Sequence, residues 1–233
     1  MKKRMIQHFF ILCERCTGSH FLQYAMTENF KIQYLKRHHT RRHFFGHEND
    51  VSSYTEEEKQ STLFIVLVRN AVDWVDSFFK RKHHVPPVNK NDIERFLKHE
   101  WYSIYETGDQ LNTEIMEDRN IYTKERYRNL LELRKVKHQY LMSLETNNIF
   151  PHVLVLRYED LRDDFENTMK SIQFVYNLQR LRPEDSEYKK IHRYKGTYTL
   201  LYQKKPILLS EPIQEYIRSH VDKEQELELG YLV

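Results

Sequence analysis

The chain has very few cysteines, and they lie close together. Among its 233 residues, cysteine occurs only at Cys13 and Cys16. A zinc site built from two cysteine pairs is therefore not expected, because no second pair is present. The Cys-x-x-Cys spacing after a predicted strand leaves a thioredoxin-like redox role open. The acidic Glu14 between the cysteines argues against it, because a neighbouring carboxylate raises the pKa of a thiol.

Long apolar runs are also lacking. No stretch approaches the roughly 18 apolar residues that a membrane-spanning helix needs, so no membrane segment is predicted. The basic N-terminus, residues 1–5, resembles the first part of a signal peptide. However, the polar Gln7 and His8 come directly after it, and the next apolar run is too short for a signal peptide. We therefore expect an intracellular, cytoplasmic protein.

The charge of the chain is nearly balanced. Charged residues make up 30% and hydrophobic residues 39% of the sequence, and the formal net charge is +3 without its 13 histidines. This composition is typical of a globular protein with a mildly basic surface. It suits an anionic ligand and lacks the excess of charge found in nucleic-acid-binding tails. No repeat or domain boundary is evident, so residues 1–233 are predicted to form a single domain.

Glycine is scarce, and the position of one glycine is informative. Gly18 is one of five glycines in the chain and lies between an apolar run at 8–12 and a helical pattern that starts near Ser19. A strand that enters a helix through a tight turn presents unpaired N–H groups and partial positive charge at the turn. Such a corner binds anions, most often phosphates. An ordinary strand–turn–helix corner remains an equal alternative for this stretch taken alone.

Two further apolar runs predict strands. Residues 63–68 and 153–156 are rich in β-branched and leucine residues, which is typical of buried strands in a parallel sheet. Each run is followed by a helical pattern, so we predict an α/β fold with three layers and a mostly parallel central sheet. A mainly helical insertion is expected over about 85–150, with a long helix from about Lys124 to Glu145. Arg69 follows the second run and lies at the strand edge where such sheets bind ligands.

Three stretches resemble the sulfotransferases that use 3′-phosphoadenosine 5′-phosphosulfate (PAPS). Residues 16–22 resemble the family's 5′-phosphosulfate loop, commonly Lys-Ser-Gly-Thr-Thr-Trp-Leu, and residues 155–161 resemble its strand that ends in Tyr-Glu-Asp-Leu. Residues 66–78 are similar to the 3′-phosphate motif, in which a serine follows the strand-ending arginine by eight residues. Arg69 and Ser77 keep that spacing. The closing Leu-Gly-Tyr at 229–231 is also common in the family.

The resemblance implies a P-loop-like sulfotransferase architecture, with PAPS as sulfuryl donor, PAP as product, and no metal. Arg69 is suited to such a cofactor because a guanidinium binds phosphate with two parallel N–H bonds. Tyr158 is expected to stack on the adenine. The positions that the resemblance assigns to cofactor binding are Arg15, Cys16, Thr17, Gly18, Ser19, His20, Phe21, Arg69, Ser77, Tyr158, Arg193, Lys195 and Gly196.

The chain departs from the family pattern at two places. Cys16 stands where the family has the loop lysine that stabilises the leaving oxygen, and the neighbouring Arg15 is the candidate replacement. Where many members have Lys-Thr-His, this chain has the run 41–43. That run makes His43 the candidate general base and Arg41 the cation near the transferred group. His47, and less so His39, are alternative bases.

The predicted activity is in-line transfer of a sulfuryl group to a hydroxyl or amine of a small-molecule or glycan acceptor. Two alternatives remain open at this point. A P-loop nucleotide kinase or NTPase requires a lysine after the loop glycines, and His20 stands there instead. A nucleic-acid-binding module would use the basic run 36–43, but no recognised nucleic-acid motif accompanies it. The sequence does not indicate the acceptor or the oligomeric state.

Overall fold

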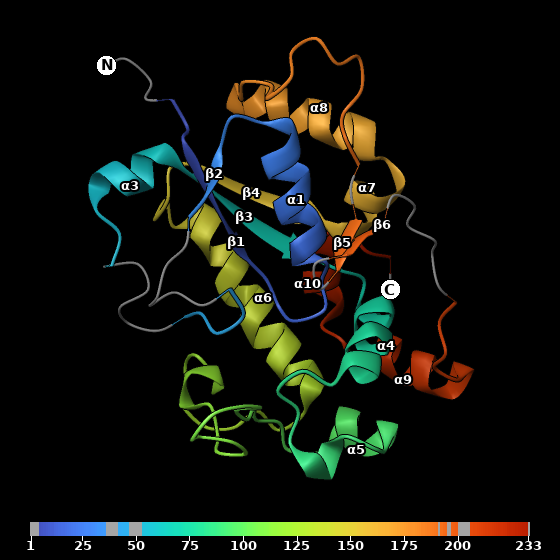
Figure 1. Ribbon diagram of the computed structural model, residues 1–233. Helices are drawn as coiled ribbons and strands as arrows, with labels where there is room; N and C mark the ends of the chain where they lie inside the picture. The colour runs from blue at the N-terminus through green and yellow to red at the C-terminus, as the bar shows by residue number, and fades with distance from the viewer. Residues whose placement is uncertain are drawn as a thin grey trace.

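A parallel four-stranded sheet forms the centre of the protein in a computed structural model that describes residues 5–35, 42–46, 53–190, 192–194, 197–199 and 206–232 (Figure 1). The strands are β1 (His8–Leu12), β2 (Gln33–Tyr34), β3 (Thr62–Val68) and β4 (Val153–Arg157). Their order across the sheet is β2-β1-β3-β4, and every neighbouring pair is parallel. The predicted α/β class with a parallel sheet is thus confirmed, and β2 adds a short strand that the sequence did not indicate.

The helices follow the strands in the order that the sequence predicted. They are α1 (Ser19–Asn29), α3 (Glu56–Ser61), α4 (Ala71–Arg81), α5 (Ile93–Lys98), α6 (Leu130–Thr146), α7 (Tyr158–Asp163), α8 (Phe165–Tyr176), α9 (Glu211–His220) and α10 (Lys223–Glu228). Short 3₁₀ turns, η1 (Pro87–Asn89) and η2 (Met116–Asp118), and a small hairpin of β5 (His192–Tyr194) and β6 (Thr197–Thr199) complete the described elements.

Alternating side chains of β1 and β3 divide the core into two layers. On one face, Ile11 and Ile65 pack with α1, α7 and α8, and on the other face Leu12 and Val66 pack with α6. Successive side chains of a strand point to opposite faces, so a strand covered on both sides must be apolar throughout. Every residue of β3 is buried accordingly. The helices α1 and α6 therefore cover opposite faces of the sheet (Figure 1).

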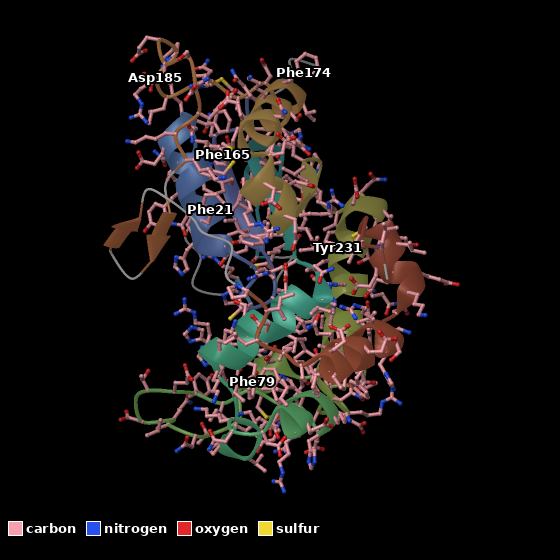
Figure 2. The ribbon with its side chains drawn as sticks, turned by 90° about the vertical axis from the view of Figure 1, so that its right-hand side faces the viewer. Phe21, Phe79, Phe165, Phe174, Asp185 and Tyr231 are labelled. Atoms are coloured by element: carbon pink, nitrogen blue, oxygen red, sulfur yellow. The ribbon has the colours of Figure 1, made fainter. Side chains whose placement is uncertain are left out.

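The aromatic pair Phe21 and Phe165 joins α1 to α8. Their rings stack at a centroid distance of 5.9 Å, and both side chains are buried between the two helices (Figure 2). Phe174, at the far end of α8, is instead 88% exposed (Figure 2). The helix that begins at the predicted anion-binding corner is thus fixed to the core from its first turn.

Two predictions about the helices and strands need correction. The long helix expected from about Lys124 begins at Leu130, because Asn129 caps it by accepting a hydrogen bond from the backbone N–H of Glu132. The residues between α5 and α6 form turns, isolated bridges and η2, so the expected insertion is less helical than predicted. In addition, β4 lies at the edge of the sheet and is only partly buried, whereas its sequence predicted a strand covered on both faces.

Within the described residues, no helix combines the length and the apolar composition that crossing a membrane would require.

We expect Ile65→Ala to reduce the free energy of unfolding by about 2–5 kcal/mol, because Ile65 is fully buried in the central strand and its truncation leaves a cavity. The matched control is Val175→Ala on the outer face of α8, where the side chain is 63% exposed and the loss should stay within about 0.5 kcal/mol. Chemical denaturation of both variants measures the difference. Equal losses would contradict the described core.

Candidate functional site

The strand order brings the predicted loop and Arg69 together. The chain passes from β1 to β2 on one side of the sheet and later returns to β3 on the other side of β1. In open α/β sheets, ligands bind at such a point of reversal, in the crevice beyond the carboxyl ends of the strands. The loop at 13–18 leaves β1 at this point, and Arg69 leaves the neighbouring β3. The site is therefore set by topology as well as by sequence motifs.

The loop delivers an uncapped helix N-terminus. Cys16 and Gly18 adopt left-handed conformations with φ of 64° and 97°, and the Thr17 hydroxyl donates to the carbonyl of Glu14 at 2.8 Å. Gly18 is the N-cap of α1, where no side chain caps the helix and no acidic residue occupies the first turn. The partial positive charge of this helix end is thus left unneutralised by the helix itself. Such an end attracts anions.

Glycine is required at position 18 for two reasons. Its φ of 97° is rarely adopted by residues with a side chain, and a Cβ atom there would lie 2.4 Å from Cδ2 of Tyr158. Tyr158 is the first residue of α7 and is 4% exposed. The loop backbone therefore lies directly against the Tyr158 ring.

Arg69 lies between the loop and the same tyrosine. Its Nη1 donates to the carbonyl of Cys16 at 2.9 Å, and its guanidinium carbon lies 4.6 Å from the centre of the Tyr158 ring. Its Nε is buried without a hydrogen-bond partner in the described part of the chain, and no described carboxylate pairs with it. The arginine therefore keeps hydrogen-bonding capacity for an anion beside the loop.

Tyr158 has a different role from the one expected. It was predicted to stack on adenine, but its ring is buried beneath the guanidinium of Arg69 and against Gly18. The guanidinium of Arg162 lies 5.7 Å from the same ring. Tyr158 therefore supports the loop and Arg69, and its ring is not free to stack on a base.

Arg42 is a site residue that the sequence did not single out. Its Nη1 donates to the hydroxyl of Ser19 at 3.1 Å, its Nη2 to Oε1 of Gln23 at 2.6 Å, and its Nε to the hydroxyl of Tyr34 at 3.2 Å. These partners are neutral, and no carboxylate of the described residues pairs with it. Arg42 thus brings an uncompensated positive charge to the first turn of α1. Arg41, His39 and His47, which were also candidates, lie outside the described residues.

His43 is held in one tautomer beside the loop. Its Nδ1 lies 2.9 Å from the carbonyl oxygen of Cys13, which can only accept, so Nδ1 carries the proton and Nε2 keeps its lone pair. Burial, assisted by the positive charges of Arg42 and Arg15, lowers the pKa of His43 to about 3. The imidazole is therefore neutral at pH 7, as a proton acceptor must be.

Arg15 does not take the position that was expected for it. The side chain is 2% exposed and turns away from the loop surface into the protein. Its Nη2 lies 2.9 Å from Oδ2 of Asp118 and 3.3 Å from Oε2 of Glu14, and its Nη1 donates to Ser103. Although burial opposes the charge, these two carboxylates raise the pKa of Arg15. The guanidinium is thus neutralised, and its prediction as the catalytic cation is not supported by this geometry.

The two cysteines have the properties of unreactive thiols. Both are reduced; Cys13 is fully buried and Cys16 partly so. Burial raises the pKa of Cys13 to about 11 and that of Cys16 to about 12. Because the thiolate is the reactive form, this environment argues against the redox alternative.

The other predicted residues occupy varied positions. The side chain of Phe21 lies in the core, so only its backbone could contact a ligand. His20 is exposed at the first turn of α1. Ser77 lies half-buried on α4, and no described contact joins it to Arg69. Only the backbone of Arg193 is described, within β5, and Lys195 and Gly196 lie outside the described residues.

Glu159 connects the motifs in a way that the sequence did not reveal. Its Oε1 accepts from the backbone N–H of Asn70, directly after Arg69, and its Oε2 accepts from the hydroxyl of Tyr231 at 2.8 Å. The glutamate of the Tyr-Glu-Asp-Leu stretch therefore links the end of β3 to the closing Leu-Gly-Tyr. A sequence alone offers no sign of such a contact between distant segments.

Metal chemistry finds no ligand set in the described part of the chain, where no three histidine, cysteine or acidic side chains gather into a group that could hold an ion. No family model matches the chain, and no curated protein matches it either. The functional argument therefore depends on the geometry of the loop and its arginines, together with the motif resemblance.

We expect Gly18→Ala to destabilise the protein more than Gly108→Ala. Both positions have positive φ, 97° and 78°, so both substitutions introduce backbone strain of about 1–2 kcal/mol. Only at Gly18 does the added methyl overlap a neighbour, because nothing lies within 4 Å of a Cβ at Gly108. Urea unfolding measures the two losses. A loss at Gly18 no larger than at Gly108 would contradict the contact with Tyr158.

Proposed function

We propose that the protein is a PAPS-dependent sulfotransferase. The observation that carries this proposal is that Arg42 and Arg69 flank an uncapped helix N-terminus, and neither pairs with a carboxylate of the described residues. An arginine without an acidic partner beside a helix N-terminus favours a ligand with several negative charges. The motif resemblance narrows such a ligand to PAPS.

The described residues divide between the two ends of this cofactor. The backbone N–H groups of Ser19 and His20, together with Arg42, are suited to its 5′-phosphosulfate. Arg69 is suited to its 3′-phosphate, with Ser77 as the family's second contact. The unpaired Nε of Arg69 supports this fit, because it is a buried donor that a phosphate oxygen would satisfy.

Arg42 supplies the positive charge that Cys16 cannot. Cys16 stands at the position of the family lysine, and Arg15 is neutralised within the protein. Arg42 instead hydrogen-bonds the first residue of α1 with an uncompensated charge. A fixed donor aimed at developing charge contributes about 3–4 kcal/mol to catalysis in comparable enzymes. We therefore assign the stabilisation of the leaving phosphate to Arg42.

His43 is the proposed general base. When bound, PAPS supplies an electrophilic sulfuryl group for attack by the acceptor's hydroxyl or amine. The Nε2 lone pair of His43 takes the acceptor's proton, while the Cys13 carbonyl holds the ring in the required tautomer. The acceptor is proposed to be a small molecule or a glycan.

We expect PAP at about 100 times its Kd to raise the melting temperature by about 5–10 °C. Arg69→Ala and Arg42→Ala should each weaken PAP binding by about 10- to 150-fold, because each removes a charge-assisted hydrogen bond to a phosphate. Arg128→Ala is the matched control, since that arginine is 84% exposed on a distant surface and should leave binding unchanged. Differential scanning fluorimetry with calorimetry measures both effects.

The comparison ligands in this experiment are ATP with Mg²⁺ and a single-stranded oligonucleotide. Stabilisation by ATP with Mg²⁺ and none by PAP would support a P-loop NTPase instead. Stabilisation by the oligonucleotide alone would support a nucleic-acid-binding module. Either outcome would contradict the sulfotransferase proposal.

The pH dependence of PAP binding tests the position of His43. The pKa of its imidazole is lowered to about 3 by burial, and a bound anion should raise it by stabilising the protonated ring. PAP binding then takes up a proton, so affinity gains from this group as the pH falls below the raised pKa. His43→Gln removes this gain, and the difference between the two calorimetric pH profiles isolates it. Identical profiles would place His43 away from the bound phosphosulfate.

A further inference from the structure

Lys137 is a buried cation that joins three separate segments of the chain. It lies in the middle of α6 and is 1% exposed. Its Nζ donates to Oε1 of Glu14 at 2.6 Å, to the backbone carbonyl of His43 at 2.9 Å, and to Oδ1 of Asp118. All three donors of the ammonium group are therefore used, and each is directed to a different segment.

The charges around Lys137 balance. Arg15 pairs with Asp118 and Glu14, and Lys137 pairs with the same two carboxylates, so the four side chains form a neutral cluster. Burial alone would raise the pKa of Asp118, but Lys137 and Arg15 lower it and keep the carboxylate charged. A buried cluster of this kind adds little net stability over an apolar replacement, because desolvation offsets the attraction. Stability is thus a weak explanation for it.

The cluster instead fixes the segment that carries His43. The ammonium of Lys137 lies 5.2 Å from the centre of the Phe45 ring and 5.8 Å from that of Phe44. It holds the backbone carbonyl of His43, while the carbonyl of Cys13 holds the imidazole Nδ1. Glu14, its other partner, directly follows Cys13 in the loop. One cation therefore ties the loop and the His43 segment to the same helix.

We infer that Lys137 is a positioning residue that sets the placement of the His43 imidazole relative to the loop. Its role in turnover rests on the proposed function. Its role in the placement of His43 does not, because the contacts belong to the protein without its ligands. A misplacement of about 1 Å can reduce catalysis about a hundredfold, so a fastening at both ends of His43 has a functional purpose.

The test separates positioning from stability by restoring charge balance. Lys137→Met leaves Glu14 and Asp118 with one cation between them and should lower the melting temperature. The double variant Glu14→Gln with Lys137→Met leaves Arg15 paired with Asp118 and should recover most of that loss. We expect its kcat nevertheless to stay about a hundredfold below that of the wild type, with KM for PAPS much less affected.

Histidine NMR gives a readout that requires no activity. In the wild type, the imidazole of His43 should titrate far below an ordinary histidine, and in the double variant its pKa should rise toward the ordinary value as the ring is released. The matched control is Arg134→Met with Glu226→Gln, which removes another buried ion pair from α6, with an Nε–Oε1 distance of 2.6 Å. It should leave the His43 titration unchanged.

The outcomes distinguish the two claims. A double variant that recovers stability, wild-type kcat and the wild-type His43 titration would overturn the positioning role. An unchanged His43 titration in that variant would overturn it even if the wild type showed no sulfuryl transfer. A released His43 titration supports it, whether or not PAPS proves to be the donor. Failure of the wild type to bind PAP would contradict only the proposed function.

Discussion

The parallel pairing of β1 with β3 is the constraint on which the site depends. Its register runs from His8 opposite Thr62 to Leu12 opposite Val66, so both strands end at the same edge of the sheet. Because the chain reverses direction across the sheet between these strands, their carboxyl ends open a crevice. The loop before α1 and Arg69 after β3 face each other there through the hydrogen bond to Cys16.

Beneath this edge, buried charge turns a generic corner into a fixed one. The cluster around Lys137 neutralises Arg15, holds the start of the loop through Glu14 and anchors the His43 segment. Arg42 remains outside that cluster, with only neutral partners among the described residues. The protein thus contains two classes of cation near the loop. Those within the cluster organise the backbone, and Arg42 and Arg69 remain for an anionic ligand.

Much of the fold could be predicted from the sequence, because apolar periodicity is a local signal. The fully buried β3 and the helices after β1 and β3 follow from it directly. The start of α6 could not be placed, because a single cap at Asn129 decided it. Within the site, the glycine turn and Arg69 were evident from spacing. The choice between Arg41 and Arg42, and the direction of Arg15, depend on contacts with residues such as Ser19 and Asp118, far away in sequence.

The most direct test of the central claim is an amide NMR titration of the protein with PAP. If the uncapped helix end and the two arginines form the site, the largest shifts occur at the backbone amides of Gly18, Ser19 and His20. The side-chain Nε–H signals of Arg42 and Arg69 should shift with them. Shifts confined to another region, such as the opposite strand edge near Gln7 and Gln33, would contradict the account, as would the absence of any shift.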